Sequence, residues 1–272
     1  MNWPRVKTIL IFLFLLVDII LLASIIVPSV SLSRIPQETI NNTVEVLAKR
    51  GIEISPESIP SRRENMGIVE LYNLWPDRQA LAGKLLGEAE TIDGITFKEG
   101  TKTLTLDDSG LKYENTNTEN KPAFELIEMG INVRDSVYEE GEDSLRLWQT
   151  VDRKKLFESE IYASKEGNRV SVSGYWIFSD RENGVIKNTP DTLLDVTGVL
   201  IDFINNPLRD AEVKITSVEI GYSAGRIYRD VEHKLVSVSP AYKISTETGA
   251  YYMYDALSGN FLYAYKNGEI IY

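Results

Sequence analysis

Residues 234–265 read KLVSVSPAYKISTETGAYYMYDALSGNFLYAY, and this stretch determines most of the expected fold. Three runs in it have the composition of β-strands: Lys234–Ile244, Ala250–Tyr254 and Asn260–Tyr265. The segments between them, Glu247–Gly249 and Leu257–Gly259, each end in glycine and are typical of turns. The stretch therefore predicts three consecutive strands joined by short turns.

A fourth strand and a helix are predicted immediately before this stretch. Glu212–Tyr222 has strand composition, and Thr189-Pro190-Asp191 resembles a helix start, with proline at the first helical position and an acid in the first turn. Asn205-Asn206-Pro207 is expected to end the helix. Its predicted apolar face consists of Leu193, Thr197, Leu200, Ile201 and Ile204.

Further helices and strands are predicted towards the N-terminus. Helices are expected at Pro36–Arg50, with Gly51 as its C-cap, and from Asp77 onwards, with Leu81, Ala82, Leu85, Leu86 and Ala89 apolar. Strands are expected near Gly67–Tyr72, Ile95–Phe97, Thr103–Leu106, Leu111–Glu114, Leu145–Val151, Leu156–Ala163 and Arg169–Phe178. Asp107–Gly110 and Lys165–Asn168 are predicted turns, and the polar segment Asn115–Lys121 is predicted to separate two lobes.

The order of a helix followed by several antiparallel strands occurs about twice along the chain, and this order predicts an α+β fold. The expected architecture is one N-terminal transmembrane helix followed by two helix-plus-antiparallel-sheet lobes. Three regions are predicted: residues 1–33 as cytoplasmic start, anchor and tether, 34–118 as the N-terminal lobe, and 119–272 as the C-terminal lobe.

The apolar run Ile9–Val27 predicts the membrane anchor, because as a helix it would span about 28 Å. Its apolar side chains should favour insertion by roughly 5–9 kcal/mol, against about 3 kcal/mol for the central Asp18. Arg5 and Lys7 before the run predict a cytoplasmic N-terminus, an outer domain and a cell-membrane location. The alternative is a cleaved signal peptide, whose apolar region is typically shorter.

Asp18 suggests a partner for this helix, since a carboxyl group at membrane depth usually faces protein or water. Helical spacing predicts a partner-binding face made of Ile11, Phe14, Asp18, Leu21, Leu22 and Ile25. This face is expected to pack against a transmembrane helix of another protein, with Asp18 hydrogen-bonding across the interface.

Composition excludes several classes of function. The 272 residues carry a formal net charge of −11, which disfavours binding to nucleic acid. With no cysteine and only His233 as histidine, thiolate and multi-histidine metal sites are not expected. No cofactor, metal or catalytic residue is predicted, and the chain is not expected to be an enzyme.

Two terminal segments resemble the YycH/YycI family of two-component-system regulators, and its YycI-like members in particular. One is Met1-Asn2-Trp3 with the following basic residues and the apolar helix; the other is Pro240–Ile244 with Tyr251–Gly259, which is also similar to a PepSY-type unit. Pro4 and Tyr242 depart from the family pattern. The resemblance implies an extracytoplasmic regulator in Gram-positive bacteria that binds a related YycH-like membrane protein and a membrane sensor histidine kinase controlling cell-wall metabolism.

Two other functions stay open. An extracytoplasmic module for a peptide or cell-wall fragment would use the tyrosines of the last strands, although strand packing also explains them. A serine hydrolase would use Ser223 of Gly221-Tyr222-Ser223-Ala224-Gly225, which matches G-x-S-x-G. No helix is expected after this motif, so a β-turn is the preferred interpretation. The acidic run Glu139–Asp143 lacks the ligand spacing of a calcium loop and is interpreted as a solvated loop.

Overall fold

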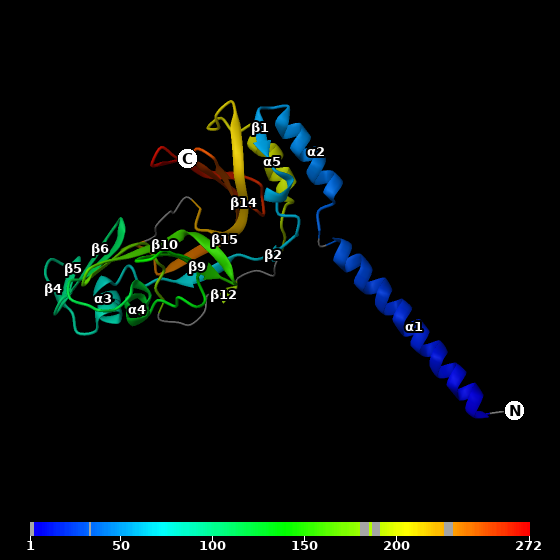
Figure 1. The fold of residues 1–272 in the computed structure, drawn as a ribbon, viewed down its shortest axis with the longest axis horizontal. Helices are drawn as coiled ribbons and strands as arrows, with labels where there is room; N and C mark the ends of the chain where they lie inside the picture. The colour runs from blue at the N-terminus through cyan, green and yellow to red at the C-terminus, as the bar shows by residue number, and fades with distance from the viewer. Residues whose placement is uncertain (1–2, 33, 180–184, 187–190, 226–230) are drawn as a thin grey trace.

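The structure is a computed structural model that describes residues 3–32, 34–179, 185–186, 191–225 and 231–272. Side chains of the first helix are described at Trp3, Lys7 and Thr8 and from Ile11 to Leu22. The helices are α1 (Trp3–Leu32), α2 (Gln37–Ala48), α3 (Arg78–Leu86), α4 (Pro122–Glu128) and α5 (Val196–Ile204), with a 3-10 turn, η1, at Pro56–Ser58 (Figure 1).

The strands of the first half are β1 (Ile52–Ile54), β2 (Asn65–Met66), β3 (Val69–Tyr72), β4 (Glu90–Thr91), β5 (Thr96–Glu99), β6 (Lys102–Asp107), β7 (Gly110–Asn115) and β8 (Val137–Glu140). Those of the second half are β9 (Ser144–Val151), β10 (Lys154–Glu166), β11 (Arg169–Gly174), β12 (Val185–Ile186), β13 (Asp191–Thr192), β14 (Val213–Ser223), β15 (Leu235–Thr246), β16 (Tyr251–Asp255), β17 (Phe261–Lys266) and β18 (Glu269–Ile271).

Local patterns predicted most of these elements well. The stretch 234–265 forms the antiparallel strands β15, β16 and β17, as predicted. Asp77 begins α3 by accepting a hydrogen bond from the Ala80 N–H at 3.0 Å, and the helix buries its apolar residues. The predicted turn at Asp107–Gly110 joins β6 to β7, where Gly110 has a φ of +126°, a conformation that favours glycine.

The predicted fold class is wrong in its division into two antiparallel lobes. In the described part of the chain, one 16-stranded sheet runs in the order β18-β17-β16-β15-β14-β10-β11-β7-β6-β5-β4, with β1, β3, β8, β9 and β12 attached beside it. The sheet is mixed, because β14 pairs in parallel with both β1 and β10. Strand β10 joins the halves: Leu156 near its start pairs with β14, its second half pairs with β11, and β9 pairs with both its start and its second half. Such pairings between distant segments have no local sequence signal.

The helices cover the sheet at two places. Figure 1 shows α2 and α5 beside β1 and β14, and α3 and α4 towards the other end, where α3 packs against β5 and β6 and α4 against β9, β10 and β11. Burial follows strand alternation, since Ile52 and Ile54 of β1 are buried and Glu53 between them is exposed. Leu47 on α2, Leu81 on α3 and Phe203 on α5 belong to one continuous hydrophobic cluster, so the two ends share a core.

The prediction of a membrane anchor is also contradicted by the structure. In the part of the chain that the structure describes, no helix is both long and apolar enough to cross a membrane. The predicted transmembrane helix at Ile9–Val27 is therefore wrong. The predicted single-pass cell-membrane location with an extracytoplasmic domain rested on that anchor and is wrong with it, whereas the role in two-component signalling stays a prediction.

Helix α5 begins later than predicted. Asp191–Thr192 forms β13 and pairs with β2 instead of opening a helix, while residues 187–190 lie outside the described part of the chain. The helix starts after Asp195, whose carboxylate accepts two hydrogen bonds from the Arg63 guanidinium at 2.7 and 2.6 Å. The buried face of α5 is accordingly Val196, Thr197, Val199, Leu200 and Phe203.

Candidate functional site

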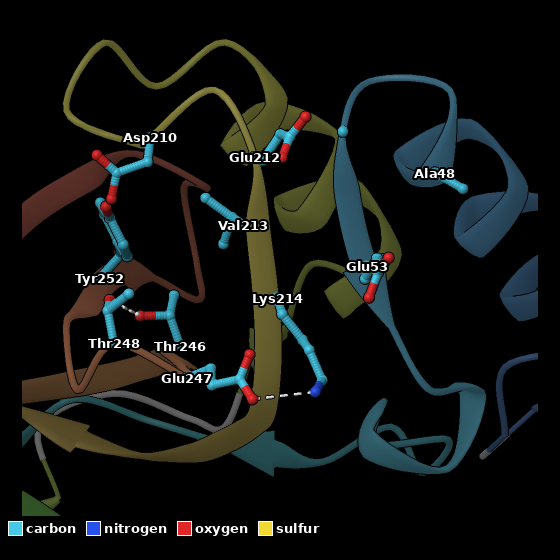
Figure 2. A pocket seen from close by; sticks show the side chains of 11 residues that line it. Ala48, Glu53, Asp210, Glu212, Val213, Lys214, Thr246, Glu247, Thr248 and Tyr252 are labelled. Carbon is cyan, nitrogen blue, oxygen red and sulfur yellow. Dashed lines mark hydrogen bonds and ion pairs between the residues drawn. The ribbon is translucent and has the colours of Figure 1, made fainter.

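A hollow of about 520 Å³ lies beside β1, where the turn after α2 meets the start of β14 and the β15–β16 turn (Figure 2). Ala48, Val213 and Tyr252 form its apolar lining. Its polar lining consists of Glu53, Asp210, Glu212, Lys214, Thr246, Glu247 and Thr248. The hollow thus combines an apolar lining with four carboxylates, and this combination determines what it can bind.

Backbone geometry brings these segments together. In the parallel pairing of β1 with β14, Ile52 lies opposite Val213 and Glu53 opposite Lys214. Gly51 has a φ of +74°, and a Cβ atom there would lie 2.7 Å from the Ala211 carbonyl oxygen. The Val213 N–H donates to the Gly51 carbonyl at 2.9 Å. Only glycine at position 51 therefore allows the chain before β14 to approach so closely.

Two of the four carboxylates are neutralised within the protein. Lys214 Nζ lies 3.1 Å from Glu247 Oε1, as Figure 2 shows, and Lys266 Nζ lies 2.6 Å from Asp210 Oδ1. The Asp210 hydrogen bond also raises the pKa of Lys266. Glu53 and Glu212 make no ion pair within the described residues, and both are exposed. Two negative charges of the hollow therefore remain available to a ligand.

The hydroxyl groups and the tyrosine of the hollow hold its shape. Thr246 Oγ1 lies 3.0 Å from Thr248 Oγ1 and donates to the Ala250 carbonyl at 2.9 Å, which closes the β15–β16 turn. The Tyr252 hydroxyl donates to the Leu208 carbonyl at 3.2 Å. Burial is the main cause that raises the pKa of Tyr252. These groups have structural partners, so the exposed carboxylates are the chemically available ones.

The G-x-S-x-G motif forms part of the core. Ser223 is fully buried at the end of β14, and its hydroxyl donates to the carboxylate of Glu158 on β10. The Ser223 oxygen in turn accepts from the Gly225 N–H at 3.0 Å, and Gly225 has a φ of +69°, as expected for a turn. A Cβ at Gly221 would lie 2.5 Å from the Lys155 carbonyl, so this glycine serves the contact between β14 and β10.

This geometry argues against a nucleophilic role for Ser223. A substrate could not reach a buried hydroxyl whose hydrogen bonds are already made. His233 is exposed and lies before the start of β15 at Leu235, whereas Ser223 pairs with Ser239, about 13 Å further along that strand. The histidine is therefore not placed to act as the base of a serine hydrolase.

The other sequence-predicted residues lie away from the hollow. Ile11, Phe14, Asp18, Leu21 and Leu22 are exposed on α1, which extends away from the sheet in Figure 1. The side chain of Ile25 lies outside the described set. Among the described residues, no group of three or more His, Cys, Asp or Glu side chains could hold a metal ion.

Most of the tyrosines considered for a ligand groove are packing residues. Tyr252, Tyr254 and Tyr263 are buried, and only Tyr252 lines the hollow. Tyr251 and Tyr265 are half-buried and stack on each other, with ring centroids 5.2 Å apart.

Sequence reasoning missed Glu53 and Glu212, the available carboxylates of the hollow. A weak signal existed for Glu53, an acid between two isoleucines directly after a glycine, which is typical of an outward position on a short strand. Its neighbours come from positions some 160 residues away, in register with β14. No local pattern could have predicted that contact.

Comparisons with known proteins find no matching family model and no matching curated protein, so the interpretation of the hollow rests on its own geometry.

Proposed function

We propose that this chain is a non-catalytic binding module that holds a lysine or arginine side chain of a peptide or protein partner in the hollow beside β1. The observation that carries the proposal is the pair of exposed carboxylates, Glu53 and Glu212, which have no ion pair within the described residues and lie beside the apolar Val213 and Tyr252. A long basic side chain matches this arrangement, because its methylene groups cover apolar surface while its charge reaches the carboxylates.

The chemistry of the hollow supports binding over catalysis. Its carboxylates are exposed, and its threonines are engaged in the β15–β16 turn. The hollow is also open to solvent, so charge pairs in it are screened and each contributes about 1 kcal/mol or less. We therefore expect weak and salt-dependent affinity. A sensor histidine kinase as the partner, which the terminal motifs imply, stays a prediction.

The proposal can be tested by NMR titration of the full chain with capped Ala-Lys-Ala, using capped Ala-norleucine-Ala as the uncharged control. The lysine peptide should bind with a dissociation constant of about 1 mM or tighter and shift resonances of β1 and β14. The norleucine peptide should bind at least about fivefold more weakly, because it keeps the aliphatic stem and loses the charge. Equal binding of the two peptides would contradict the proposal.

A matched pair of double variants separates the hollow from the general acidity of the protein. Glu53→Gln with Glu212→Gln should weaken lysine-peptide binding at least about fivefold. Glu90→Gln with Glu166→Gln removes the same charge from exposed positions on β4 and β10 and should change affinity less than about twofold. Equal losses in both double variants would mean that long-range attraction, not the hollow, holds the peptide.

A further inference from the structure

Strand β8 has one free edge. Among the strand pairs of the described residues it pairs with β9 alone, and all four of its residues are exposed. An unpaired strand edge presents backbone donors and acceptors that another chain can use. Natural edge strands are commonly protected by proline, by short length or by charged side chains; β8, with the sequence VYEE, has no proline, and its two glutamates repel acidic strands but not a basic one.

The hairpin geometry shows which groups face outward. The Gly141 N–H donates to the Ser144 carbonyl at 2.8 Å, so these two residues form a hydrogen-bonded pair next to the turn. Hydrogen-bonded and non-hydrogen-bonded pairs alternate along an antiparallel ladder. The backbone groups of Tyr138 and Glu140, which pair with Leu147 and Leu145, therefore point away from β9 towards the free edge.

An apolar groove follows this edge. Two adjoining hollows of about 340 and 170 Å³ lie between α4 and the β8–β9 hairpin and share Ala123, Glu140 and Leu145. Beside them Phe124 is 61% exposed and Tyr138 is 52% exposed. Exposed aromatic side chains along a free strand edge are typical of surfaces that bind a partner.

Charge identifies the kind of partner. Glu139, Glu140, Glu142 and Asp143 follow one another along the edge and its turn, and none has an ion pair within the described residues, although Arg146, which pairs with Glu160, lies opposite Glu139 and attracts it. Arg134 and Lys121 are the cations among the residues that line the two hollows, so the edge is acidic on balance. A second copy of this chain would bring the same acids to the same edge and would be repelled. A basic segment is complementary.

We infer that β8 binds an extended basic segment of a partner protein, which adds to the sheet as a further strand. Backbone groups of the segment pair with those of Tyr138 and Glu140, and alternate apolar side chains enter the groove against Ala123 and Leu145. Lysine or arginine residues of the segment meet the carboxylates of the edge and turn. This surface is separate from the hollow beside β1, so the inference does not depend on the proposed function.

A labelled peptide, acetyl-(Lys-Val)4-amide, serves as the probe, with fluorescence anisotropy of the full chain as the measurement. Tyr138→Pro removes an outward N–H without removing a hydrogen bond to β9, and it should weaken binding at least about tenfold. Tyr138→Val removes the ring but keeps the N–H, and should weaken binding less than about threefold. Thermal unfolding of both variants checks that the hairpin remains folded.

Two further arms do not depend on the folding of a variant. The probe N-methylated at its four central residues cannot pair with the edge and should fail to bind, and acetyl-(Glu-Val)4-amide should fail because of its charge. Equal binding of the methylated probe, or no binding of the parent peptide at about 1 mM, would overturn the inference. Loss of parent binding in the Glu53→Gln, Glu212→Gln protein alone would overturn it in favour of the hollow. A wild-type dimer that Tyr138→Pro dissociates would overturn it in favour of self-association.

Discussion

Two buried carboxyl groups, Glu125 on α4 and Glu158 on β10, show how differently one residue type can be accommodated in one core. Glu125 is fully buried and accepts hydrogen bonds from four side chains within twelve residues of it: Tyr113, Asn115, Thr118 and Asn120. Burial alone would raise its pKa, but these donors, Thr118 and Tyr113 foremost, lower the pKa below its usual value.

Glu158 has partners from distant parts of the chain. Tyr263 on β17 donates to it at 2.6 Å, the Ala224 N–H donates at 3.2 Å, and the Ser223 hydroxyl is its third donor. Burial raises the pKa of Glu158, and these donors do not offset that effect. A local polar loop therefore lowers the pKa of one carboxyl group, whereas the three donors that the sheet brings to the other leave its pKa raised.

The largest expected effect comes from removing each carboxyl group. Glu125→Ala should lower the free energy of unfolding by about 3–5 kcal/mol, because each buried donor left without a partner costs about 1–3 kcal/mol. Glu158→Ala should cost less, about 1–3 kcal/mol, because Glu158 has three donors instead of four and the unfavourable burial of its carboxyl group offsets part of the loss. Urea unfolding measures both, with Glu128→Ala, an exposed acid on α4, changing stability by less than about 1 kcal/mol. Equal losses at the two buried sites would remove the distinction between them.

The next largest expected effect is on the pH dependence of stability, to which the two carboxyl groups should contribute in opposite directions. The lowered pKa of Glu125 means that its contribution to stability is present above about pH 4.5 and is lost as the pH falls through its folded-state value. The raised pKa of Glu158 means that its contribution is present below about pH 4.5 and is lost as the pH rises.

Urea unfolding from about pH 2 to pH 9 should therefore show two opposite trends, that of Glu125 below about pH 4.5 and that of Glu158 above it. The free energy of unfolding of Glu125→Gln, relative to that of wild type, should rise as the pH falls. That of Glu158→Gln should rise relative to wild type as the pH rises. A single group can change stability by at most about 1.4 kcal/mol per pH unit, which sets the scale. Trends of the same sign in both variants would show that the two carboxyl groups ionise alike.

The smallest expected effect comes from single hydroxyl groups. Tyr113→Phe should cost about 1.5–3 kcal/mol, since it removes a hydrogen bond of 2.6 Å to an ionised acceptor. Tyr263→Phe should cost about 0.5–1.5 kcal/mol, since the raised pKa of Glu158 indicates that its hydrogen bonds do not offset the burial of the carboxylate. Thermal unfolding at neutral pH measures the difference, and the exposed Tyr162→Phe is the control. A larger loss for Tyr263→Phe than for Tyr113→Phe would reverse the comparison.

The same contrast separates what the sequence could predict from what it could not. Local signals were sufficient for α3, where Asp77 precedes the apolar face of Leu81, Ala82, Leu85 and Leu86, and for the turns between the last strands. The polar segment Asn115–Lys121 was interpreted as a boundary because polar residues dominate it. Three of its side chains instead hydrogen-bond the buried Glu125, a role that depends on a helix that follows it.

Pairing over long distances was beyond local patterns. In the sequence, Glu158 has the pattern of an ordinary acidic residue in a strand. No residue near it predicts that Ser223 and Tyr263 are its hydrogen-bond partners. The prediction of two lobes was wrong for the same reason, because the join rests on Leu156 of β10 lying opposite Tyr222 of β14. The hollow depends equally on a distant pair, Glu53 opposite Lys214.

The parallel pairing of β1 with β14 also has a consequence for the order of events during translation. Ile54 leaves the ribosome long before its partner Ile215, and synthesis of the chain between them takes roughly 10–30 s at 5–20 residues per second. For that period Ile40 and Leu47 on α2 have no α5 to pack against, although both are buried in the finished protein. The apolar face of α2 therefore stays without its packing partner until the last third of the chain emerges.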